Sequence, residues 1–88
     1  MIPGPAGNLE AMIDDSNEGS WVIFCHPHPL YGGSMFDAVL DTVEKAVAPL
    51  NLSTLRFNFR GVGSSDGEHD HGDGEVNDLV SVVEWLRQ

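Results

Sequence analysis

The sequence is poor in cysteine, in basic residues and in long apolar stretches. Cys25 is the one cysteine, so the chain cannot form an internal disulfide or a cluster of thiolate metal ligands, and a reducing, cytoplasmic compartment is expected. No apolar run approaches the roughly 18 residues that a membrane span needs, and the first residues lack the basic start of a secretory signal. We therefore expect no membrane partner.

Positive charge is scarce as well. Four Lys and Arg residues stand against 14 Asp and Glu residues, which gives a formal net charge of -10. A chain with this charge is repelled by phosphate groups, so nucleic acid and anionic membrane surfaces are poor partners.

The 88 residues are fewer than the roughly 150 of a typical domain, and 41% of them are hydrophobic. This composition predicts a single partial domain over residues 1–88 with one modest core. Its first part, residues 1–20, is rich in turn residues and contains one edge strand. The rest, residues 21–88, is expected to form a β-α-β-α unit.

Three segments predict strands, at about 8–13, 21–25 and 53–59. The segment 21–25 is apolar at every position, which is typical of a strand covered on both faces in a parallel sheet. Strand, strand, helix, strand and helix follow one another along the chain. This order predicts the α/β class, with a mostly parallel sheet of about three to four strands.

Two segments predict helices, at about 34–48 and 73–88. In the first, Ser34 is the expected N-cap and Pro49 the expected stop, because the residue before a proline avoids helical backbone angles. In the second, acidic residues crowd the first turn, where the helix dipole favours negative charge. The apolar stripes expected to face the core are Phe36, Val39, Leu40, Val43 and Val47 in the first helix and Val76, Leu79, Val80, Val83 and Leu86 in the second.

The loop at residues 63–67, with the sequence Gly-Ser-Ser-Asp-Gly, matches the nucleophile-elbow pattern G-x-S-x-G. An elbow places its serine on a sharp turn that leads at once into a helix, but here the helical pattern begins only near Asp73. The later histidines, His69 and His71, also follow too closely to complete a triad. We interpret Ser65 as a turn residue and not as a nucleophile. Asp66 likewise argues against a phosphate-binding turn, so no dinucleotide cofactor is expected.

The four histidines form two H-x-H pairs, His26 with His28 and His69 with His71. Alternate residues of a strand share a face and can chelate a metal ion, but both pairs lie in predicted loops, where that geometry is not given. We favour two unrelated loop pairs. A small metal-binding module that uses all four histidines stays open as an alternative.

The turn His26-Pro27-His28-Pro29 follows the carboxyl end of a buried strand, where ligands collect in open α/β sheets. Proline has no N–H group, so the donors of this turn come from His26, His28 and Leu30. Such amides could stabilise a developing oxyanion, an interaction worth about 3 kcal/mol per donor in a dry site. From the spacing alone, a stiff turn that binds no ligand explains these residues equally well.

Two motifs together carry a resemblance to a known family: H-P-H-P-x-x-G-G at residues 26–33 and R-F-N-F-R-G-V-G at residues 56–63. With Asp-His-Gly-Asp-Gly-Glu at 70–75, they resemble the N-terminal part of an α/β-hydrolase. The small single-domain group with an H-P-H-P turn, which includes dienelactone hydrolases and other small serine esterases, is the most similar.

The resemblance implies ester or acyl bond hydrolysis and gives the loop at residues 26–31 a role. In the family the loop after the third strand donates one oxyanion-hole amide, which we place at His28, with Leu30 or Tyr31 as competitors and His26 at the start of the loop. Strand 53–59 would be the fourth strand of the family. The loop at residues 61–67 would be the turn after it, which carries no nucleophile.

In the family, the nucleophile elbow, the acid and the histidine come later than any residue present here. We therefore expect a truncated, inactive hydrolase segment that carries the oxyanion loop only. The family's fifth strand lies beside its third, so strand 21–25 would keep an open edge, and self-association or a complementary C-terminal hydrolase fragment is expected there. A non-catalytic association domain is the remaining alternative.

Overall fold

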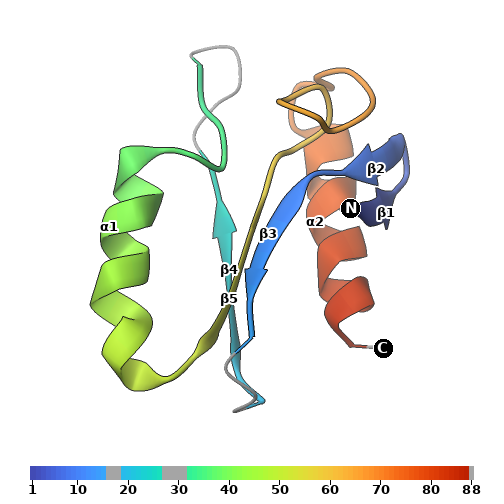
Figure 1. Ribbon diagram of the computed structural model, residues 1–88. Helices are drawn as coiled ribbons and strands as arrows, with labels where there is room; N and C mark the ends of the chain where they lie inside the picture. The colour runs from blue at the N-terminus through green and yellow to red at the C-terminus, as the bar shows by residue number, and fades with distance from the viewer. Residues whose placement is uncertain (16–18, 27–31, 88) are drawn as a thin grey trace. The chain divides into compact units, whose positions relative to one another are not determined.

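The structure is a computed structural model that describes residues 1–15, 19–26 and 32–87 (Figure 1). They form two compact units, Ala11–Phe57 and Met1–Glu10 with Asn58–Gln88, which we describe separately. In these ranges no helix is long and apolar enough to cross a membrane. The elements are, in chain order, β1 (Ile2–Gly4), β2 (Gly7–Leu9), β3 (Ala11–Asp14), β4 (Trp21–Cys25), α1 (Ala38–Val47), the 3₁₀ helix η2 (Ala48–Leu50), β5 (Ser53–Phe57) and α2 (Asp73–Leu86).

The unit Ala11–Phe57 contains a three-stranded sheet in the order β3-β5-β4. The strand β4 pairs in parallel with β5, with Ile23 opposite Leu55, and β3 pairs antiparallel with β5, with Met12 opposite Arg56. The predicted strands at 21–25 and 53–59 are confirmed, although the second ends at Phe57. A mostly parallel sheet was expected, but the described sheet is mixed, because β3 runs antiparallel to β5.

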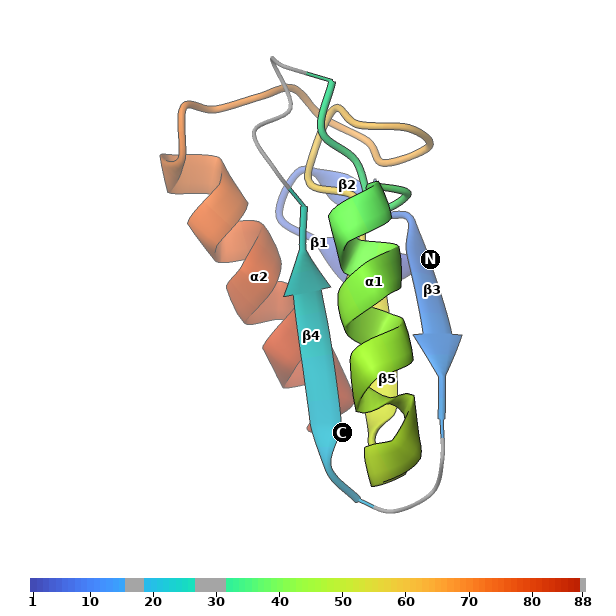
Figure 2. The same ribbon diagram turned by 90° about the vertical axis from the view of Figure 1, so that its left-hand side faces the viewer.

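The centre of this unit is β5, whose five residues are all buried. Leu55 and Phe57 have no exposed surface and point to one face of the sheet, whereas Thr54 and Arg56 point to the other, because side chains alternate along a strand. Figure 2 shows α1 running in front of β5, with β4 on one side of it and β3 on the other. The helix therefore covers the face to which Arg56 points.

The helix α1 begins later than the sequence predicts. Asp37 is its N-cap, and Asp37 Oδ1 accepts a hydrogen bond of 2.8 Å from the Val39 N–H group. The predicted cap, Ser34, instead belongs to the turn before the helix, where its carbonyl accepts a hydrogen bond of 3.1 Å from Asp37 N–H. The helix ends at Val47, as expected from Pro49, which lies in η2.

The predicted apolar stripe of α1 is wrong in part. Leu40 is buried, but Phe36, Val39 and Val43 are 61%, 65% and 40% exposed. The helix is turned so that Asp41 and Glu44 reach Arg56 on β5. An ion pair with a buried guanidinium thus decides which residues of the helix face the sheet, and part of the apolar stripe is left in solvent.

The second unit contains an antiparallel hairpin, β1 with β2, and the helix α2, which contacts β1 (Figure 1). Ile2 and Leu9 lie opposite each other in the hairpin, and both are buried. The sequence predicts one strand at about 8–13, but the structure divides it at Glu10. Residues 7–9 pair within the hairpin and residues 11–14 pair with β5.

The predicted apolar stripe of α2 is also wrong in part. Val76, Val80 and Val83 are exposed, and the buried positions are Gly74, Glu75, Asp78 and Val82. Asp78 is bound to Arg60, so a polar contact again sets the rotation of the helix.

The corrected face of α2 can be tested with one substitution at two positions. Val82 has no exposed surface and Val80 is 47% exposed. We expect Val82→Ala to lower the free energy of unfolding by about 1.5–3 kcal/mol, and Val80→Ala to change it by less than about 0.5 kcal/mol. Urea denaturation followed by circular dichroism measures both, and equal losses would contradict the assignment.

Candidate functional site

His26, directly after β4, lies at the carboxyl end of the parallel strand pair, where α/β sheets bind ligands. Cys25 lies opposite Phe57 in the parallel pair, so β4 and β5 end at the same level, and His26 follows directly. His26 is buried at 6% exposure. Of the predicted oxyanion loop, the structure describes His26. The other predicted loop residues, His28, Leu30 and Tyr31, lie outside the described residues.

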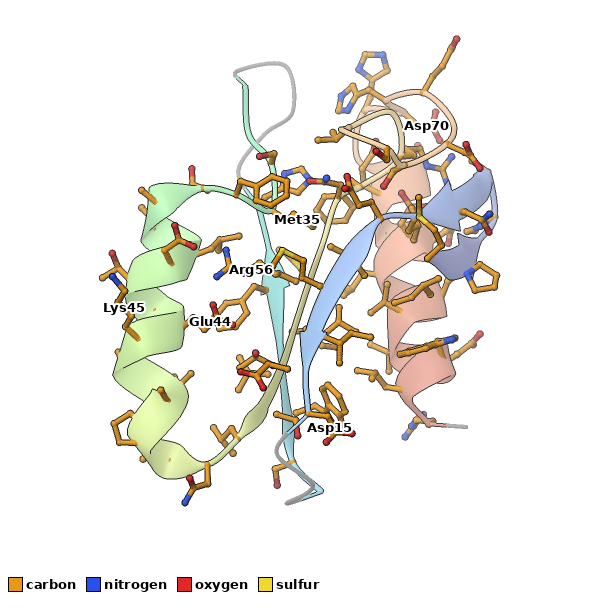
Figure 3. All side chains as sticks on the ribbon, viewed as in Figure 1. Asp15, Met35, Glu44, Lys45, Arg56 and Asp70 are labelled. Atoms are coloured by element: carbon orange, nitrogen blue, oxygen red, sulfur yellow. The ribbon has the colours of Figure 1, made fainter. Side chains whose placement is uncertain are left out.

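The chain returns from this loop through Gly32–Met35 to α1, and Arg56 anchors that return. Arg56 Nη1 donates hydrogen bonds to the Met35 carbonyl at 2.9 Å and to Asp41 Oδ1 at 2.7 Å. Its Nη2 pairs with Glu44, whose other oxygen accepts a bond of 3.0 Å from Thr54 Oγ1. Figure 3 shows Arg56 reaching from β5 toward Glu44, with Met35 beside it. One guanidinium therefore joins β5, α1 and the end of the loop.

The charge of Arg56 is held by its partners. Burial alone would disfavour the guanidinium ion, but the hydrogen bonds and charges of Asp41 and Glu44 outweigh it and raise the pKa of Arg56 above its ordinary value. Sequence reasoning did not single out Arg56. The available signal was a charged residue in the middle of a strand that is otherwise expected to be buried, since such a charge has to be paired.

In the other unit, the serine of the G-x-S-x-G match is engaged with the backbone. Ser65 Oγ accepts a hydrogen bond of 2.8 Å from Glu10 N–H and donates one of 2.7 Å to the Asn58 carbonyl. Ser65 is 8% exposed, and α2 starts only at Asp73. This geometry supports the interpretation of Ser65 as a turn residue.

Glu10 holds the same loop from a second side. Glu10 Oε1 accepts hydrogen bonds from Asn58 Nδ2 at 2.7 Å and from Ser64 N–H at 2.9 Å. Gly63, the residue before Ser64, has a positive φ of 54°. A Cβ atom at this position would collide with the side chains of Asn58 and Glu10. The glycines of this loop therefore serve close packing, and Glu10 is a structural residue that sequence reasoning missed.

Arg60 ties the following part of the loop to α2. Asp78, which has no exposed surface, accepts hydrogen bonds from Arg60 N–H at 3.0 Å and from Nη2 at 2.9 Å. The hydrogen bond to Asp78 raises the pKa of Arg60. Gly74, in the first turn of α2, leaves the space that the guanidinium occupies, because a Cβ atom there would overlap it.

The histidine pair of this unit contacts the start of α2. His69 Nδ1 lies 3.2 Å from Glu75 Oε2, and the rings of His69 and His71 meet edge to face at 5.0 Å. Within the described ranges, no three histidine, cysteine, aspartate or glutamate side chains are grouped so that they could hold a metal ion. His69 thus faces a carboxylate. Of the four histidines in the metal-binding alternative, His28 lies outside the described residues.

The strand order β3-β5-β4, with a helix between the two parallel strands and a second helix after β5, is that of a partial α/β-hydrolase fold. This finding confirms the fold class expected from the two motifs.

The chain is similar to two solved α/β serine hydrolases. One is a serine hydrolase homologue from Coxiella burnetii, with 49% sequence identity and a TM-score of 0.92, which the chain matches over 98% of its own length and 43% of the other chain. The other is a lidless serine hydrolase from Xanthomonas campestris, with 41% identity and a TM-score of 0.90 over 98% of this chain and 42% of that one. These similarities support an α/β-hydrolase N-terminal segment.

A curated relative from Rickettsia prowazekii, an uncharacterized protein, is 39% identical over 87 residues. The match covers 97% of this chain and 37% of the relative, so the chain spans well under half the length of the proteins it resembles. No protein-family model matches the chain.

The contacts of Glu75 predict a loss of stability in acid. Burial opposes its ionisation, but the backbone N–H groups of Asp70, Glu75 and Gly72 and the nearby His69 bring its pKa below the ordinary 4.5. A lowered pKa in the folded state stabilises the protein above the unfolded-state value, and this contribution disappears as the pH falls through the folded-state pKa.

We therefore expect the difference in free energy of unfolding between the parent chain and Glu75→Gln to be largest above about pH 5 and to shrink below pH 4. Urea denaturation at a series of pH values measures it. A difference that stays constant over this range would contradict the assignment.

Proposed function

We propose that this chain forms the N-terminal part of a serine hydrolase that cleaves ester or acyl bonds. The observation that carries the proposal is the similarity to α/β serine hydrolases at 41% and 49% identity over nearly the whole chain. The H-P-H-P turn at residues 26–29 favours the group of small esterases that includes dienelactone hydrolases. The one cysteine, which is free and exposed, fits a reducing compartment, and we propose the cytoplasm.

The part of the reaction assigned to this chain is the stabilisation of negative charge. When a nucleophile attacks an ester carbonyl, the carbonyl oxygen becomes an anion, and backbone N–H groups aimed at that position lower the barrier. We assign this role to the loop of His26, His28, Leu30 and Tyr31, with the His28 amide as the principal donor. The loop starts from buried His26 and ends at Met35, which Arg56 holds.

The nucleophile belongs to polypeptide outside these 88 residues. Ser65, the only serine in a G-x-S-x-G pattern, has its hydroxyl occupied by Glu10 N–H and the Asn58 carbonyl. A serine nucleophile needs a neighbouring base to take its proton, and a backbone carbonyl is not one. We therefore assign the chain no acyl-transfer activity of its own.

Labelling with a fluorophosphonate probe tests the assignment of the nucleophile. We expect the 88-residue chain to remain unlabelled under conditions in which a known serine esterase is labelled fully, because the Ser65 hydroxyl has no base. The Ser65→Ala variant should give the same result. Robust labelling of the parent chain that is lost in Ser65→Ala would overturn the proposal.

The oxyanion role of the loop is tested by removing the backbone N–H group of His28. The chain would be combined with the part of the Xanthomonas campestris hydrolase that it does not cover, called here the complementing polypeptide. In the combined enzyme we expect His28→Pro, which lacks the N–H group, to lower kcat for p-nitrophenyl acetate by about 100-fold or more. The control His28→Ala keeps the amide and should retain most of kcat, and equal losses would contradict the role of the amide.

A further inference from the structure

The strand β3 (Ala11–Asp14) lies at one edge of the described sheet. It pairs with β5 on one side, and no strand within residues 1–15, 19–26 and 32–87 pairs with its other side. Met12, Ile13 and Asp14 are exposed. An exposed edge of this kind can accept a further strand from another polypeptide.

The hydrogen-bond pattern shows which backbone groups of β3 face outward. Asn58 N–H donates a bond of 2.9 Å to the Glu10 carbonyl, so these two residues form a hydrogen-bonded pair of the antiparallel ladder. Bonded and non-bonded pairs alternate along such a ladder, and the register continues into β3 and β5. Ala11 and Ile13 therefore occupy the non-bonded positions, and their N–H and C=O groups point away from β5.

A groove adjoins this edge on the side of α1. It has a volume of about 260 Å³ and is lined by Met12, Ile13, Asp14, Glu44 and Arg56. Met12 lies opposite Arg56 in the ladder, so both side chains are on the face of the sheet that α1 covers. Asp14 shares this face, because it is two residues further along the strand. A side chain of an added strand on the same face would enter the groove.

The charge of the groove selects a cation. Arg56 is the basic residue among those that line it, and its charge is already met by Asp41 and Glu44. Asp14 adds another negative charge, and Figure 3 shows Lys45 on the side of α1 away from Arg56. The excess of carboxylates favours a partner that brings positive charge. A second copy of this chain would bring a net charge of -10 and would be repelled.

We propose that the free edge of β3 and the groove beside it, called here the β3 edge site, bind an extended basic segment of a partner protein. The backbone of the segment pairs with the outward N–H and C=O groups of Ala11 and Ile13. A Lys or Arg side chain of the segment lies in the groove, with its aliphatic part against Met12 and its charge beside Asp14. The proposal goes beyond the proposed function, because it uses none of the residues after β4.

The binding experiment uses the 88-residue chain and two synthetic peptides with blocked ends. The basic peptide is Thr-Lys-Val-Lys-Val-Lys-Thr, which places its lysines on one face of a strand, and the acidic control has Glu in place of each Lys. We expect the basic peptide to bind at least about tenfold more tightly in an NMR titration. The amides of Ala11 and Ile13 should exchange hydrogen more slowly in the complex.

Two pairs of variants separate the β3 edge site from general attraction to an acidic chain. Ile13→Pro removes an outward N–H group at an edge position, where proline is tolerated, and should weaken binding at least about tenfold, whereas Ile13→Val should stay within about threefold. Asp14→Lys should also weaken binding at least about tenfold. The control Glu68→Lys makes the same change in net charge at an exposed residue of the other unit and should stay within about threefold.

Circular dichroism shows whether each variant is folded, and if Ile13→Pro is not, the two lysine variants decide. The proposal is overturned if the basic peptide does not bind at about 1 mM, or if both peptides bind equally well. Equal losses in Asp14→Lys and Glu68→Lys would reduce the effect to general charge attraction and would overturn it too. So would a stable dimer of the chain that protects residues 11–14, because the occupant would then be a second copy.

Discussion

The buried guanidinium of Arg56 organises the unit that contains the sheet. It lies on a strand with no exposed residue, so its charge has to be met by carboxylates, and Asp41 and Glu44 of α1 meet it. That requirement sets the rotation of the helix about its axis and leaves Val39 and Val43 in solvent. The same side chain holds the Met35 carbonyl, which ends the loop assigned to oxyanion stabilisation. The orientation of α1 and the end of the loop thus follow from one buried charge.

The strands could be predicted because their signal is local. An uninterrupted apolar run such as Trp21–Cys25 favours a strand, and the strand is confirmed, although Phe24 is its one buried residue and Cys25 is exposed. The strand β5 is confirmed as well, and all five of its residues are buried. The division of the first predicted strand at Glu10 could not be predicted in this way. It depends on partners that are distant in sequence, since Glu10 binds Asn58, Ser64 and Ser65.

The helix faces were predicted less well, for a related reason. Periodicity counts apolar residues and assumes that they face the core, but in each helix a carboxylate, Glu44 in α1 and Asp78 in α2, turns toward an arginine on another segment. Asp78 displaces Val80 on α2 just as Asp41 and Glu44 displace Val39 on α1. The candidate site shows the same division. The motifs pointed to the loop after β4 and to Ser65 as a turn residue, whereas Arg56 and Glu10, which hold these loops, belong to no motif.

The link from Asp41 and Glu44 through Arg56 to Met35 has a mechanical consequence. Since a single planar group grips both the helix and the end of the loop, α1 cannot roll or slide without straining the Met35 contact. A force on the helix is therefore passed on to the segment Gly32–Met35, whose last carbonyl is fastened to α1 through one side chain.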